Sequence, residues 1–140
     1  MAKFLILSAC SLMAFPSQAH EGHDHGPGTV PSQKGGVMRS LETINLELVY
    51  KDKSIEIYPF STEIDAKTPG KLKPMDISRY PVSATIELPK KKPAAIDLKP
   101  AGDHWAASFD AQEAHRFTLV LSIKQGGHQD KVKWTIEPKK

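Results

Sequence analysis

Apolar and polar residues alternate with a period of two along most of the chain after Gly35. Successive side chains of a β-strand point to opposite faces, so this alternation predicts strands that are buried on one side. The segment 43–51, for example, places Ile44, Leu46 and Leu48 on one face. The predicted strands are residues 36–41, 43–51, 54–60, 82–88, 94–99, 104–110, 115–124 and 130–137.

The order of these segments predicts the fold class. They are short, they are separated by turn residues such as Gly, Pro and Asp, and none shows sustained helical spacing. We therefore expect one immunoglobulin-like antiparallel β-sandwich of seven to eight strands over residues 35–140. Pro59 cannot donate a ladder hydrogen bond, which predicts that strand 54–60 lies at a sheet edge or ends there. Glu47 and Glu56 point away from the predicted core, so we expect water to solvate them.

The first 19 residues have the pattern of an export signal. Lys3 gives a positive start, residues 4–15 are almost wholly apolar, and Ala19 ends a short run of small residues. The apolar run is too short to span a bilayer, and no later stretch is long enough. We expect cleavage after Ala19, and a periplasmic or secreted protein with no transmembrane segment in its mature chain.

Cys10 supports a second interpretation of the same region. Leu7-Ser8-Ala9-Cys10 fits a lipoprotein signal, in which the cysteine becomes the lipidated first residue. The apolar core before it would then be unusually short, which favours ordinary cleavage after Ala19. Cys10 is the only cysteine in the chain, so the expected mature domain contains neither a disulfide nor a thiolate ligand.

The residues that follow the signal form the candidate metal site. Residues 20–34 are rich in Gly, Pro and polar residues, which predicts a flexible tail. This tail includes His20, His23 and His25, with Asp24 among them. Imidazole nitrogens bind copper and zinc, and nearby carboxylates can complete the coordination sphere. A solvated low-complexity tail that binds metal only incidentally is the alternative interpretation.

Composition excludes several other classes of function. A formal net charge of +3 is too small and too evenly distributed to predict nucleic-acid binding. The chain has no Gly-x-Ser-x-Gly elbow, no phosphate-binding Gly-Lys-Ser loop and no His-Glu-x-x-His helix. We therefore expect a binding protein and not an enzyme.

Several motifs resemble a known periplasmic module. They are Lys34-Gly35-Gly36-Val37, Asn45-Leu46-Glu47-Leu48-Val49-Tyr50, Ile55-Glu56-Ile57-Tyr58 and Ile96-Asp97-Leu98-Lys99-Pro100-Ala101-Gly102-Asp103. Together they are similar to the small β-sandwich that leads some periplasmic adaptor proteins of heavy-metal efflux pumps. The sequence has no counterpart of the long helical hairpin and barrel of a full adaptor. The resemblance implies an accessory protein that buffers copper or zinc or delivers it to an efflux adaptor or another envelope protein.

A second resemblance concerns His104. An N-terminal histidine combined with an aspartate and a histidine on a sandwich, here His20, Asp103 and His104, resembles the small periplasmic copper carriers, although the spacing is not reproduced cleanly. A surface histidine beside a turn is the alternative interpretation of His104. The alternative for the whole protein is an immunoglobulin-like interaction module of the envelope with no metal role, which would use strand 54–60 as its edge.

Overall fold

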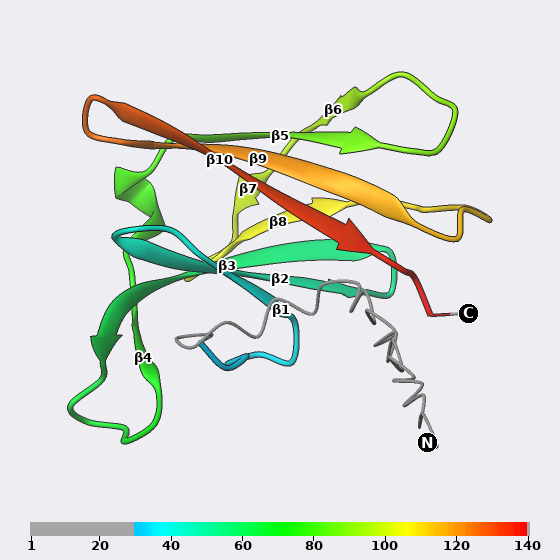
Figure 1. Cartoon of the computed structure of the whole chain (residues 1–140). Helices are drawn as coiled ribbons and strands as arrows, with labels where there is room; N and C mark the ends of the chain where they lie inside the picture. Colours follow the sequence, from blue (N-terminus) through cyan, green and yellow to red (C-terminus); the bar gives the residue numbers. More distant parts are fainter. Residues whose placement is uncertain (1–29, 140) are drawn as a thin grey trace, which may run out of the picture.

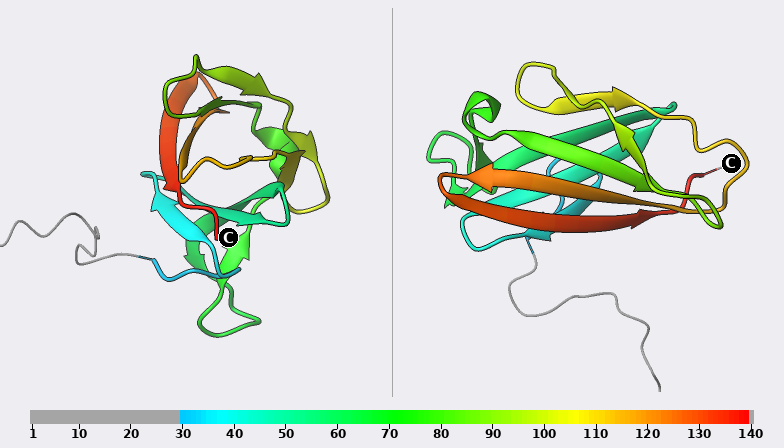
Figure 2. Two further views of the ribbon diagram at one scale, coloured as in Figure 1. Left: turned by 90° about the vertical axis from the view of Figure 1, so that its right-hand side faces the viewer. Right: turned by 90° about the horizontal axis from the view of Figure 1, so that it is seen from above.

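The computed structural model describes residues 30–139 and confirms the predicted immunoglobulin-like antiparallel β-sandwich. Two sheets face each other across one core (Figure 1; Figure 2). The expected signal peptide and the histidine cluster at residues 20–25 lie outside the described residues. Within residues 30–139 there is no helix long and apolar enough to cross a membrane.

Sheet A has six strands in the order β1-β2-β3-β8-β7, with β4 also paired to β3. All its pairings are antiparallel. Its strands are β1 (Val37–Ser40), β2 (Ile44–Lys51), β3 (Ser54–Ile64), β4 (Leu72–Pro74), β7 (Lys99–Pro100) and β8 (Trp105–Ser108).

Sheet B has four strands in the order β10-β9-β5-β6, and its pairings are also antiparallel. Its strands are β5 (Val82–Glu87), β6 (Ala94–Ile96), β9 (Phe117–Gln125) and β10 (His128–Ile136). A short 3-10 helix, η1 (Ile77–Arg79), precedes β5. The Asp76 side chain accepts a hydrogen bond from the Ser78 N–H and so caps this helix.

The core lies between the inward faces that the alternation predicted. In sheet A the inward positions of β2 and β3 are almost completely buried, and in sheet B those of β9 and β10 are. The largest fully buried apolar side chains are Trp134, Phe117, Ile44, Leu46, Leu48, Ile55, Ile57, Leu119, Leu121 and Ile123. Burial of these side chains, each contributing about 1.5–3 kcal/mol, is the main force that holds the two sheets together.

The structure corrects the predicted place of strand 54–60. This segment is the first part of β3, and β3 lies in the interior of sheet A between β2 and β8. Pro59 is tolerated because β8 pairs only with residues 54–57 of β3. The Pro59 carbonyl points away from β2 and accepts a hydrogen bond from the Met75 N–H, 3.3 Å away. The missing N–H of Pro59 faces the same side, where β8 has already ended.

Two strands escaped the sequence pattern. The three residues of β4 lie inside the predicted irregular connection 61–81, and β7 is separated from β6 where one strand was expected. Both are too short for alternation to be detected. β4 pairs with the last part of β3, beyond the end of β8, so both parts of this long strand have a partner on that side.

Side chains join the two sheets along the side where β1 and β10 meet. The Trp134 indole N–H of β10 donates to the Val37 carbonyl of β1 at 2.9 Å, and Arg39 Nε of β1 donates to the Lys133 carbonyl of β10 at 3.3 Å. These bonds satisfy a fully buried indole and fix β1 against the opposite sheet.

Candidate functional site

His104 is the one residue of the predicted metal set that the described residues include. It ends the turn between β7 and β8, in which the Ala101 N–H donates to the His104 carbonyl at 2.8 Å. Gly102 has φ +80, a backbone conformation that glycine adopts without strain. His20, His23, Asp24 and His25 lie outside the described residues, so their role as ligands stays a prediction.

Asp103 orients the His104 ring. His104 Nδ1 lies 2.8 Å from Asp103 Oδ1, and the histidine side chain is only 17% exposed. The hydrogen bond with His104 lowers the pKa of the Asp103 carboxyl, which is therefore ionised at neutral pH and can only accept. Nδ1 must then carry the proton, which leaves the lone pair of a neutral ring on Nε2. Metal-binding histidines use the same arrangement, in which a carboxylate accepts a hydrogen bond from the proton-bearing nitrogen and the other nitrogen faces the metal.

Tyr58 of β3 supports the other side of the His104 ring. The two rings stack with their centroids 4.5 Å apart at an angle of 28°. The Tyr58 hydroxyl donates to Glu56 Oε2 at 2.6 Å. Burial raises the pKa of Tyr58, and the hydrogen bond to Glu56 and its negative charge raise it further. Tyr58 therefore stays a neutral phenol that fixes His104.

The chain that follows the histidine cluster reaches this same place. Lys34 Nζ lies 5.2 Å from the centroid of the Tyr58 ring, within the range of a cation–π contact. Eight residues separate His25 from Lys34, so the two are nine steps apart along the chain, and nine extended residues span at most about 30 Å. The histidine cluster therefore lies close in sequence to the segment that contacts Tyr58, the residue on which His104 stacks.

A buried carboxylate holds residues 32–36 in position. Glu47 of β2 is completely buried and accepts hydrogen bonds from the Ser32 hydroxyl and from the backbone N–H groups of Gln33, Lys34 and Gly36. Burial alone would raise the pKa of Glu47, but these four donors outweigh burial and lower it. The carboxylate is thus charged and fully satisfied, and we call this arrangement the Glu47 clamp.

The Glu47 clamp corrects the expectation that Glu47 is solvated. It also means that residues 32–34, which the composition assigned to the flexible tail, pack against sheet A. Alternation identified the outward direction of the Glu47 side chain correctly but could not show that another segment covers it. Ser32 and the Gly35-Gly36 pair, which give a hydroxyl donor and a close approach of the backbone, were the available signals.

Two further histidines, His115 and His128, are weaker candidates for metal ligands than His104. His115, the first residue of the predicted strand 115–124, is exposed in the loop before β9, because β9 begins at Phe117. His128 Nε2 lies 3.1 Å from Asp130 Oδ1, but the histidine side chain is 76% exposed. His128 therefore provides a natural comparison for His104, with the same partner type but no stacked ring.

Among residues 30–139, no three His, Cys, Asp or Glu side chains come together in a way that could hold a metal ion. Within that part of the chain His104 can supply one nitrogen ligand. Comparisons with protein-family models, with curated proteins and with solved structures find no match.

Proposed function

We propose that this protein is an exported metal-binding accessory protein that buffers copper or zinc, or delivers it to an efflux system in the periplasm. Its ligands are the imidazoles of His20, His23 and His25, with Asp24 beside them, and Nε2 of His104. The observation that carries the proposal is the orientation of His104 by Asp103 and Tyr58, next to the point where the histidine-bearing chain meets the sheet.

Chemistry supports this combination of ligands. Neutral imidazole is a good ligand for Zn(II) and Cu(II), and a hydrogen bond from Nδ1–H to a carboxylate raises the basicity of Nε2. One ligand on the sheet and several on the leading segment make an open site, in which an incoming partner can replace one nitrogen at a time. Such exchange suits a protein that passes its ion on.

Titration with Cu(II) and Zn(II) tests the proposal. We expect binding at about micromolar concentrations, with affinity falling as pH drops through the histidine range near about 6.5. Changing His20, His23 and His25 together to Ala should abolish this binding. If that variant binds as well as the parent protein, the histidine cluster is not the site.

A matched pair of variants tests His104 separately. We expect His104→Ala to weaken Cu(II) binding about tenfold or more and to change its electron paramagnetic resonance spectrum. His128→Ala removes a histidine that is also bonded to an aspartate but lies at the β9–β10 turn, and should change neither. Equal effects of the two substitutions would remove His104 from the site and leave the cluster alone.

The alternative function, an interaction module that adds a strand at residues 54–60, has lost its proposed edge because β3 is paired on both sides. An interaction role at another surface would be revived if the protein captured an envelope protein without metal. That capture would also have to survive substitution of Ser54 or Glu56.

A further inference from the structure

An open hollow lies at the end of the sandwich where the β2–β3 turn is found. Its volume is about 920 Å³, and three segments line it: residues 88–91 between β5 and β6, residues 111–116 between β8 and β9, and residues 137–138 after β10. These segments come together at the right-hand end of Figure 1, which faces the viewer in the left panel of Figure 2. The volume is in the range of small-molecule sites.

The inner wall of this end hollow is apolar. Leu88 packs against the core, and Ala111 is only 3% exposed. A second, smaller hollow of about 280 Å³ shares Leu88, Pro89 and Arg116 and reaches Phe117, a core residue. The wall therefore offers an apolar surface that continues toward the core.

The rim of the end hollow carries more positive than negative charge. Lys90, Lys91 and Arg116 are permanent cations, and none of them forms an ion pair with another residue of the described chain. Glu113 and Glu137 are the carboxylates of the lining, and they are likewise unpaired within residues 30–139. The cations thus keep their donors available for an anion.

Two backbone positions at this hollow are strained. Lys90 has φ +59 at the third residue of the turn closed by the Lys91 N–H and the Leu88 carbonyl, and Gln112 has φ +55 at the second residue of the turn closed by Ala114 and Ala111. Glycine adopts both conformations without strain. Residues in such conformations cluster at functional sites, although Asp52 and Lys53 of the β2–β3 turn also have positive φ.

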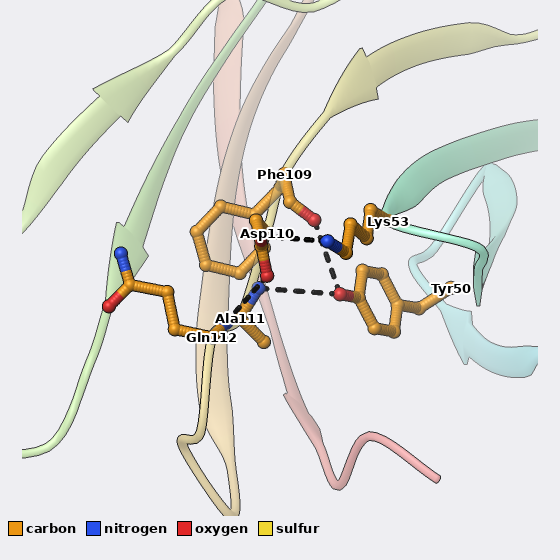
Figure 3. Close-up of polar contacts among 6 residues, drawn as sticks. All are labelled: Tyr50, Lys53, Phe109, Asp110, Ala111 and Gln112. Atoms are coloured by element: carbon orange, nitrogen blue, oxygen red, sulfur yellow. Dashed lines mark hydrogen bonds and ion pairs between the residues drawn. The ribbon is translucent and has the colours of Figure 1, made fainter. Parts of the chain in front are cut away.

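Polar contacts with Tyr50 and Lys53 hold the β8–β9 loop that carries Gln112 (Figure 3). The Tyr50 hydroxyl donates to the Phe109 carbonyl at 3.2 Å and accepts from the Ala111 N–H at 3.4 Å. Asp110 accepts from the Gln112 N–H at 2.8 Å and pairs with Lys53 at 3.0 Å. This support fixes the β8–β9 loop, so a ligand would meet a wall that is already formed.

We propose that the end hollow binds an amphipathic organic anion, a carboxylate on a short apolar chain. The apolar wall formed by Leu88, Pro89 and Ala111 takes the chain, and Arg116 with Lys90 and Lys91 takes the carboxylate. Charge selects the head group, because the three cations outnumber the two rim carboxylates. This site is separate from His104, which lies at the β7–β8 turn.

Titration with octanoate, followed by amide NMR of the full mature protein, tests the site. We expect shifts in residues 88–91 and 111–116, with octylammonium and acetate binding about tenfold weaker or worse, since the first has the wrong charge and the second lacks the chain. Equal binding of octanoate and octylammonium, or octanoate shifts confined to other residues, would overturn the proposal.

Substitutions separate the cations from general surface charge. Arg116→Gln should weaken octanoate binding about tenfold, while Lys131→Gln, which removes an exposed lysine from the outward face of β10, should leave it unchanged. Lys90→Gly should weaken binding while raising the melting temperature, because it removes the strained conformation together with the ammonium group. If Lys90→Gly binds octanoate as well as the parent protein, Lys90 is not part of the site.

Discussion

The outward faces of the two sheets follow the same alternation but have different surroundings. On sheet A, Asn45 and Glu47 point outward and are 2% and 0% exposed. On sheet B, Thr85 and Val120 point outward and stay partly exposed, and Lys133 is exposed. Period-two alternation therefore specifies the direction of a side chain, whereas a segment from elsewhere in the chain decides whether water reaches it.

Hydrogen-bond donors account for the difference. The segment 32–36 brings four donors to Glu47, enough to compensate a carboxylate for its lost water. The outward residues of sheet B interact with one another instead, as where the Thr118 and Thr135 hydroxyls lie 3.3 Å apart. The outward face of sheet A thus carries a buried charge that a covering segment satisfies, whereas on the outward face of sheet B polar side chains bond to one another.

The largest expected effect comes from removing the buried carboxylate. Glu47→Ala should reduce the free energy of unfolding by about 2–4 kcal/mol, because four donors lose a charged partner. Glu87→Ala, at an outward position of β5, should change it by about 0.5 kcal/mol or less. Urea unfolding measures both, and similar losses would mean that the Glu47 clamp does not stabilise the fold.

Substitution of two glycines compares the backbone of sheet A near Glu47 with that of sheet B. A Cβ at Gly36 would lie 2.2 Å from the Leu48 carbonyl oxygen, so Gly36→Ala must displace the segment that covers Glu47. We expect a loss of about 1–3 kcal/mol. Gly127, in the β9–β10 turn, has no atom within 4 Å of the same position, and Gly127→Ala should change stability by about 0.5 kcal/mol or less. Thermal unfolding of both variants checks the contrast.

Acid should weaken the Glu47 clamp. The pKa of Glu47 is lowered in the folded protein, so its contribution is complete above the ordinary glutamate pKa of 4.5 and is lost as pH falls through the folded-state pKa. Asp76, Asp103 and Asp110 also have lowered pKa values and act in the same direction. Glu47→Gln should therefore flatten the loss of stability below about pH 4.5 without abolishing it. An unchanged pH profile of urea unfolding would contradict this assignment.

The smallest expected effect concerns Tyr58. Glu56→Gln removes a negative charge that opposes ionisation of the phenol, so the pKa of Tyr58 should move down toward its ordinary value of about 10. Stability at neutral pH should change by about 0.5 kcal/mol or less, since Glu56 is only partly buried. Ultraviolet titration of the phenolate measures the change, with Tyr58→Phe identifying the signal.

Most of the fold could be predicted because each long strand has one apolar face. The core positions of β2, β3, β9 and β10 all followed from alternation. The place of β3 was predicted wrongly. A proline removes a ladder bond only at its own position and on one side of the strand, and β8 has already ended before Pro59. β4 was missed because three residues carry no detectable period.

The candidate site was harder to predict. Asp103-His104 could be found from its position after a turn, but its stacking on Tyr58 depends on strands 46 residues apart in the sequence. The Glu47 clamp joins residues 11–15 apart, and three of its four donors are backbone N–H groups, which carry no side-chain signature. The assignment of His20, His23, Asp24 and His25 stays a prediction.

The side-chain bridge between β1 and β10 has a consequence for self-association. A long unpaired strand is a template on which copies of a protein can stack into fibrils. The nine residues of β10 border sheet B, but the Arg39 guanidinium already occupies the Lys133 carbonyl and Trp134 anchors the neighbouring strand. Another copy of the protein that paired with β10 at Lys133 would have to displace this arginine first, which disfavours edge-to-edge association at that point.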